Sequence, residues 1–169
     1  MTKIFAHRGA SAYAPENTME AFELAAKQGA DGIELDVHVT KDGEVVGTHD
    51  EKIERVSNGS GFVKDMTLRE LKRLSFHNHM ESYVGAGIPT LREVLEFVKT
   101  TTMAVNIELK TGLYWYPNIE EKTVALVHEL GMQERIIYSS FNHHSIAKLK
   151  EIDSAAETAW LFSDVILNV

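Results

Sequence analysis

Short apolar runs alternate with longer segments of helical periodicity along this 169-residue chain, and no other feature restricts the possible folds as strongly. Candidate strands are residues 4–6, 32–39, 44–48, 103–109, 135–139 and 156–161, and candidate helices are 15–28, 67–74, 90–98, 120–130 and 142–152. Strands that are separated by helices pair in parallel through right-handed crossovers. The sequence therefore predicts an α/β fold around a mostly parallel sheet.

The third candidate strand is an exception to this pattern. Asp42-Gly43 is a turn signal between the second and third strands, and the link is too short for a helical crossover. The direction of the third strand stays open at this point. If it folds back as a hairpin, His49 at its end returns beside Glu34, and either path keeps His49 near the second strand.

The number of strands is smaller than a closed barrel requires. A TIM-type (β/α)8 barrel has eight strands and typically about 250 residues. We expect residues 1–169 to be a single barrel domain that covers roughly the first six strands and lacks the C-terminal ones. The chain ends in Ile166-Leu167-Asn168-Val169, without a helix stop signal or a polar tail. A natural half-open α/β sheet is the alternative.

Composition excludes several classes of function. A formal net charge of -8 argues against nucleic acid as a partner, whereas a phosphorylated small molecule is compatible with local positive charge. The absence of cysteine excludes disulfides, zinc–thiolate sites and thiol catalysis. The N-terminal residues MTKIFAHRGA have no long apolar region, and no run of 18 apolar residues occurs, so we expect a cytoplasmic protein without a membrane span.

Charged side chains occupy alternate positions of two otherwise apolar strands. Glu34 and Asp36 share one face of the second strand, and Glu108 and Lys110 share one face of the fourth. Burying unpaired carboxylates costs on the order of several kcal/mol, which a divalent cation would remove. Oxygen ligands favour Mg²⁺ or Ca²⁺, with Mn²⁺ as a further candidate, over zinc. We predict a cation site at Glu34, Asp36 and Glu108 and an anion ligand at Lys110; a ligand-free Glu–Lys pair is the alternative.

Two histidines follow strands at positions where parallel barrels carry their active sites. His7-Arg8 follows the first strand, and His49 follows the third. Imidazole exchanges protons near neutral pH, so we predict that His7 and His49 form an acid–base pair, with the order of their roles left open. The planar guanidinium of Arg8 matches the geometry of a phosphate group.

Several residues have weaker predicted roles. Asn17 or Thr18 would cap the first helix, and Glu16 or Asn17 would also hydrogen-bond a histidine or the metal ligands. His38 would point inward beside Asp36 if its strand stays regular, but a packed or solvated imidazole is the simpler interpretation. The run Tyr114-Trp115-Tyr116 would either shape substrate access or pack as a loop.

An ordered set of motifs resembles the glycerophosphodiester phosphodiesterase family. The segments, which extend to about residue 141, are His7-Arg8-Gly9, Pro15-Glu16-Asn17-Thr18, Glu34-Leu35-Asp36-Val37, Thr40-Lys41-Asp42-Gly43, His49-Asp50, Glu108-Leu109-Lys110 and Ser139-Ser140-Phe141. The resemblance implies a TIM-barrel hydrolase that cleaves glycerophosphodiesters, such as glycerophosphocholine, to sn-glycerol 3-phosphate and an alcohol. The site residues that it implies are a metal set, an acid–base pair, two phosphate ligands and a pocket residue, namely Glu34, Asp36 and Glu108, His7 and His49, Arg8 and Lys110, and Phe141.

The resemblance also implies a reaction path, in which the glycerol 2-hydroxyl attacks phosphorus and water opens the resulting cyclic phosphate. The last strands of the family, with an aromatic residue of its pocket, have no counterpart in this sequence. The alternatives are a phospholipase C- or D-like phosphodiesterase and an inactive truncated barrel that serves as a binding domain. A homo-oligomer in which two chains complete one another also stays open.

Overall fold

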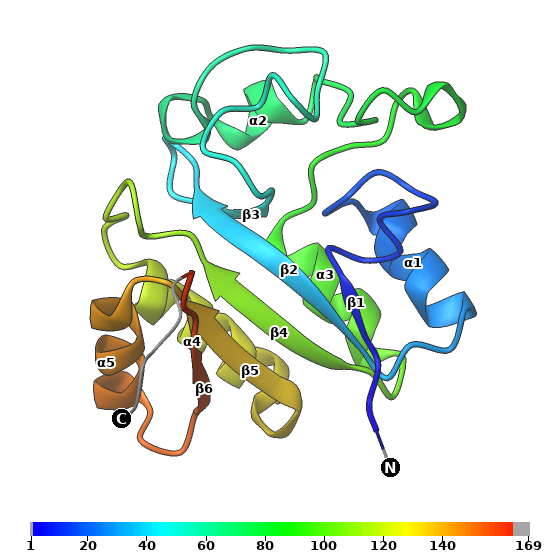
Figure 1. Ribbon diagram of the computed structural model, residues 1–169. Coiled ribbons are helices and arrows are strands. Elements are labelled where there is room, and N and C mark those ends of the chain that lie inside the picture. The colour runs from blue at the N-terminus through cyan, green and yellow to red at the C-terminus, as the bar shows by residue number, and fades with distance from the viewer. Residues whose placement is uncertain (1, 164–169) are drawn as a thin grey trace.

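One sheet organises residues 2–163, the part of the chain that the computed structural model describes (Figure 1). Its parallel strands are neighbours in the order β1 (Phe5–His7), β2 (Gly32–Val39), β4 (Ala104–Leu109), β5 (Ile136–Ser140) and β6 (Glu157–Trp160). The short strand β3 (Val45–Gly47) pairs antiparallel with the end of β2. The third strand is therefore a hairpin arm, and the parallel wall has five of the six strands in the described residues.

Helices cover one side of this wall (Figure 1). They are α1 (Met19–Lys27), α3 (Leu91–Lys99), α4 (Ile119–Leu130) and α5 (His143–Ile152). The second strand explains why the helices lie on this side, because Ile33, Leu35 and Val37 alternate with the polar residues and are fully buried in the main apolar core. The other face of the wall carries the alternate, partly charged side chains, as the strand pattern predicts.

The helix starts follow their sequence signals closely. Thr18 caps α1 by accepting a hydrogen bond from the backbone N–H of Ala21, and Thr90 and Glu93 form a capping box at α3. The short helix α2 (Leu68–Leu71) has the same capping box, built from Thr67 and Glu70, but it ends three residues before the predicted end at Leu74. Of the two predicted candidates for the first cap, Thr18 is the cap and Asn17 is not.

The segment between β3 and α3 forms a second, smaller unit beyond the carboxyl end of β2 (Figure 1). It contains α2 and short 3₁₀ turns at Val63–Asp65 and Glu81–Tyr83. This unit, which we call the cap segment (residues 48–89), has a small apolar core of Ile53, Val56, Val63, Leu71, Phe76 and Ile88, which packs with Val46 of β3. The cap segment therefore does not depend only on the main core for its packing.

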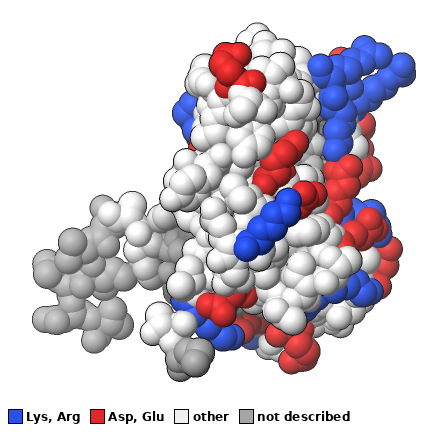
Figure 2. Space-filling view, turned by 90° about the vertical axis from the view of Figure 1, so that its right-hand side faces the viewer, with Lys and Arg blue, Asp and Glu red and all other residues white. Residues whose placement is uncertain are grey.

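The surface and the ends bear on two further predictions. The net charge is -8, and on the face shown in Figure 2 acidic and basic side chains both lie among uncharged ones. Within residues 2–163, none of the helices has the length and apolar character required to cross a bilayer. Residues 166–169, whose lack of a helix stop signal or polar tail contributed to the expectation of missing C-terminal strands, lie outside the described residues.

Candidate active site

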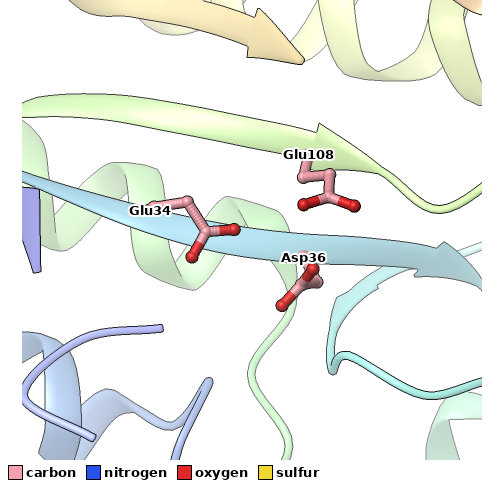
Figure 3. Close-up of side chains that lie close together, drawn as sticks. All are labelled: Glu34, Asp36 and Glu108. Atoms are coloured by element: carbon pink, nitrogen blue, oxygen red, sulfur yellow. The ribbon is translucent and has the colours of Figure 1, made fainter. Parts of the chain in front are cut away.

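Three carboxylates meet on the inner face of the wall. Asp36 and Glu108 are register partners on β2 and β4, and Glu34 precedes Asp36 by two positions, so all three side chains point to the same face. Each offers an oxygen within 4.8 Å of the others, and all three residues are at least nine-tenths buried. Figure 3 shows the three carboxyl groups turned toward one another.

The protein supplies too little positive charge for this carboxylate cluster. Glu34 Oε1 and Asp36 Oδ1 are buried and have no hydrogen-bond partner. Burial, and then the charge of Asp36, raise the pKa of Glu34 to about 8. Hard oxygen donors in this arrangement fit a divalent cation, which would satisfy the two orphaned oxygens and favour the ionised form of all three groups.

Lys110 lies at the rim of the carboxylate cluster. Its ammonium donates a hydrogen bond to Glu108 Oε1 at 2.9 Å and lies 3.6 Å from Asp36 Oδ1. It also approaches His49 Nε2 at 3.2 Å. Lys110 therefore connects the carboxylates to one of the two predicted acid–base residues.

The turn after β1 directs Arg8 back toward β2. Arg8 has a φ of 58°, which is uncommon for a residue with a side chain, and its backbone N–H donates to Glu34 Oε2 at 2.9 Å. Gly9, which follows at a φ of 78°, leaves no space for a side chain, because an added Cβ would lie 2.7 Å from Ala21. The guanidinium of Arg8 is 3.5 Å from Asp36 Oδ2 and donates to Glu16 Oε1 at 3.0 Å.

Asn17 fixes Asp36 through two hydrogen bonds. Its Nδ2 donates to Asp36 Oδ2 at 2.9 Å, and its Oδ1 accepts from the backbone N–H of Asp36 at 3.2 Å. Asn17 is buried and has a φ of 55°, a conformation that Asn tolerates better than most residues. Its contact is with a carboxylate of the predicted metal set, whereas Glu16 contacts arginines; neither side chain bonds a histidine.

His49 is held by a chain of hydrogen bonds. Its Nδ1 lies 2.6 Å from Asp50 Oδ1, and Arg55 Nε donates to the other oxygen of Asp50 at 2.6 Å. The far end of Arg55 donates to both oxygens of Glu16, at 2.8 and 2.9 Å. Burial alone would raise the pKa of Asp50, but hydrogen bonds from Arg55 and His49 hold it at about 2.

His7 lies on the opposite side of the carboxylate cluster and is held much more loosely. Its side chain is 70% exposed, and Nε2 is 3.8 Å from Glu34 Oε2. As the hairpin alternative predicts, β3 folds back along β2, where Thr48 N–H donates to the Asp36 carbonyl, and it brings His49 to Lys110. The two predicted acid–base residues thus flank the cluster from different strand ends.

His38 points inward along β2, as a regular strand requires, and is fully buried. Its Nδ1 lies 2.8 Å from the Tyr116 hydroxyl, and its Nε2 lies 3.1 Å from the backbone carbonyl of His49. Burial lowers the pKa of His38, which keeps the imidazole neutral. His38 is therefore a packed residue that supports the strand end carrying His49, and Tyr116 belongs to the same support.

Phe141 is half exposed at the end of β5 and lines a small cavity of about 120 Å³. Glu108 and Lys110 line the same cavity, and so does Glu51. Trp115 is 70% exposed and lines a different cavity of about 300 Å³ between α4 and α5. Phe141 therefore lies beside Glu108 of the carboxylate cluster, whereas Trp115 lines another cavity.

Sequence reasoning missed the contribution of Arg55 and gave no role to Asp50. Arg55 lies in an irregular loop without hydrophobic periodicity, so no local pattern points to it. Asp50 directly follows His49, and a carboxylate beside a predicted catalytic histidine was a usable signal.

Comparison with known proteins identifies the family. The model of the glycerophosphoryl diester phosphodiesterase family matches residues 7–166. The chain is 49% identical over 152 residues to a glycerophosphodiester phosphodiesterase of Caldanaerobacter subterraneus subsp. tengcongensis, covering 89% of this chain and 63% of that protein. The chain thus spans somewhat less than two thirds of the length of this relative.

Solved structures agree in fold. The glycerophosphodiester phosphodiesterase of Agrobacterium tumefaciens matches with a TM-score of 0.85 and 39% identity, over 94% of this chain and 66% of that one. An Oleispira antarctica phosphodiesterase, solved in complex with the product sn-glycerol-3-phosphate, matches with a TM-score of 0.82 and 32% identity, over 95% and 66%. These matches confirm the predicted TIM-type α/β fold class. The chain belongs to the glycerophosphoryl diester phosphodiesterase family.

Proposed function

We propose that the protein, in its functional form, hydrolyses glycerophosphodiesters to sn-glycerol 3-phosphate and an alcohol with the help of a divalent cation. The observation that carries the proposal is the buried cluster of Glu34, Asp36 and Glu108, with two oxygens unsatisfied and an imidazole on either side. The product bound to the Oleispira antarctica relative supports the choice of substrate.

In this proposal the three carboxylates hold Mg²⁺, Ca²⁺ or Mn²⁺. The bound cation would supply charge stabilisation for the phosphoryl oxygens. Because the cation would balance the charge of the carboxylates, the ammonium of Lys110 would be free to leave Glu108 and Asp36 and to bind a phosphate oxygen. Arg8, already directed into the site, would bind a second oxygen.

His7 and His49 would move the protons of the reaction. One imidazole would take the proton of the glycerol 2-hydroxyl as its oxygen bonds to phosphorus, and the other would give a proton to the departing alcohol as its P–O bond breaks. Water would then open the cyclic phosphate, with the two histidines in exchanged roles. The use of the substrate's own hydroxyl gives the rate advantage of an intramolecular reaction. Phe141 would form one wall of the pocket.

Product analysis tests the proposal and separates it from a phospholipase-like reaction. The purified chain is incubated with glycerophosphocholine, and separately with intact phosphatidylcholine, in EDTA and after addition of each cation. We expect sn-glycerol 3-phosphate and choline from the first substrate only, with reversible loss in EDTA. Phosphocholine as product, or activity that is indifferent to EDTA, would contradict the proposal. His49→Ala should lower kcat by about 100-fold or more while the chain stays folded.

A further inference from the structure

The strongest unassigned feature is the chain of hydrogen bonds that ends on His49. Asp50 accepts from His49 at one oxygen and from Arg55 Nε at the other, both at 2.6 Å. A carboxylate only accepts, so the proton in the first contact is on His49 Nδ1. Nε2 then has the lone pair, and the ammonium of Lys110 lies 3.2 Å from it.

The far end of the chain is anchored near the phosphate side of the site. Arg55 donates through both terminal nitrogens to Glu16, whose side chain is largely buried and also accepts from Arg8. Burial would raise the pKa of Glu16, but the hydrogen bond and charge of Arg55, followed by Arg8, lower it. The guanidinium groups of Arg8 and Arg55 therefore balance the charges of two carboxylates, those of Glu16 and Asp50. Hydrogen bonds between these groups hold their side chains in place.

We propose that Asp50 and Arg55 are positioning residues, which hold His49 in the tautomer with Nδ1 protonated and leave Nε2 facing the reaction. Arg55 acts as a two-ended clamp between Asp50 and Glu16, so the orientation of His49 is tied to the segment that holds Arg8. A carboxylate orients the histidine of serine hydrolases in the same way. This inference rests on the proposed function for its catalytic consequence, although the tautomer itself does not.

The chain offers a matched control for Arg55. Arg92 makes a similar two-nitrogen contact with a carboxylate, Glu129, at 2.8 and 2.7 Å, and the two arginine side chains are 45% and 44% exposed. Arg92 lies on α3, on the helix-covered side of the wall, and contacts none of the site residues. Arg92→Gln therefore removes a two-nitrogen ion pair of an arginine with matched exposure, to a more exposed carboxylate, without touching the clamp.

The experiment combines kinetics on glycerophosphocholine with proton–nitrogen NMR correlation spectra of the histidine rings. The His49 signals are identified by their loss in His49→Gln. We expect Asp50→Asn to lower kcat about 100-fold or more and Arg55→Gln about tenfold, with KM changing less than about threefold. In both variants, neutral His49 should shift from the Nδ1-protonated form toward a mixture of tautomers. Arg92→Gln should change neither kcat nor the spectrum.

Two results would overturn the inference. One is an Arg55→Gln protein with wild-type kcat and an unchanged His49 tautomer. The other is a loss of kcat that follows only the fraction of unfolded protein, measured by thermal unfolding, with the tautomer unchanged. If the wild-type chain hydrolyses no glycerophosphodiester, the proposed function fails, and the NMR comparison still decides whether Asp50 and Arg55 set the tautomer.

Discussion

Two groups of carboxylates lie at the same mouth of the wall and have opposite surroundings. In the cluster of Glu34, Asp36 and Glu108, Lys110 pairs with Glu108 and Asp36 and Arg8 pairs with Asp36, yet Glu34 and Asp36 each retain a buried oxygen without a hydrogen-bond partner. In contrast, both oxygens of Glu16 and both oxygens of Asp50 have hydrogen-bond partners, which are Arg8 and Arg55 for Glu16 and His49 and Arg55 for Asp50. The pKa of Glu34 rises to about 8, whereas that of Asp50 falls to about 2.

The difference indicates what each group is built for. A carboxylate that is fully bonded by its own chain is a structural support, because nothing further is needed to stabilise its charge. A buried carboxylate that lacks such partners requires a ligand from outside the chain, or protonation. We therefore infer that Glu16 and Asp50 position other side chains, and that Glu34, Asp36 and Glu108 bind a cation.

The largest effect should come from neutralising a carboxylate of the cluster formed by Glu34, Asp36 and Glu108. Asp36→Asn should lower kcat/KM at least about 1000-fold, equivalent to roughly 4 kcal/mol, because it would remove a proposed cation ligand. The metal-free variant should be no less stable than the wild type, since it has one buried charge less. Kinetics and thermal unfolding with and without cation measure both effects.

Asp65→Asn is the control for this substitution, since Asp65 is exposed and, among residues 2–163, forms an ion pair only with Lys64. It should leave both measurements unchanged. If the cation raised the thermal stability of Asp36→Asn as much as that of the wild type, the assignment of Asp36 as a ligand would be wrong.

Metal removal should make stability depend on pH. The pKa of Glu34 is raised in the folded protein, so its contribution is fully present below the unfolded value near 4.5 and is lost as pH rises through about 8. In EDTA, the free energy of unfolding should therefore fall between pH 5 and pH 9 by an amount on the order of a few kcal/mol. Saturating cation should reverse this fall.

Denaturant titrations across this pH range provide the measurement, and Glu34→Gln provides the control, because it cannot titrate. An EDTA-treated wild type whose stability changes no more than that of Glu34→Gln would show that the cluster is not short of positive charge.

A smaller loss of stability is expected on substituting Asn17, which supports Asp36 from a backbone position with positive φ. Asn17→Ala loses two hydrogen bonds to Asp36 and places alanine at a positive φ, which together should cost about 2–4 kcal/mol. Asn118 has nearly the same φ, 60°, at the start of α4, but its side chain makes no capping bond. Asn118→Ala should therefore cost only about 1 kcal/mol. Equal losses in urea unfolding would remove Asn17 from the support of Asp36.

The smallest effect should be the loss of the stability that Asp50 contributes, at acidic pH. The pKa of Asp50 is lowered in the folded protein, so its contribution is present above about pH 4 and is lost as pH falls toward 2. Asp50 is about one third exposed, so screening should keep this contribution below about 1 kcal/mol. Arg55→Gln should flatten the acidic part of the stability curve. A wild-type curve that matches that of Arg55→Gln would contradict the pairing.

The strands and the three carboxylates could be predicted from the sequence because their causes are local. Alternation in residues 32–39 gave the bounds of β2 and the common face of Glu34 and Asp36. The α/β order then made β4 a parallel neighbour, which brought Glu108 to the same face. The capping signals at Thr67 and Thr90 were local in the same sense.

The remaining site contacts depend on long-range packing. Arg55 reaches Glu16 across 39 positions of the sequence, through a loop that has no period. The direction of β3 stayed open because a short link and an apolar run are compatible with more than one path, and hydrogen bonding with the end of β2 decides it. Asn17 was expected at a helix cap or beside the metal ligands, and its positive φ could not be read from residue type alone.

The separate apolar core of the cap segment has a consequence for engineering. Because residues such as Ile53, Val63 and Leu71 stabilise this segment internally, its outward positions can be varied without opening the core of the wall. Glu51, which lines the cavity beside Phe141, lies in the same segment. A combinatorial library confined to the cap segment, with His49, Asp50 and Arg55 left unchanged, would therefore explore new preferences for the departing alcohol while Arg8 and Lys110, the proposed phosphate ligands, stay constant.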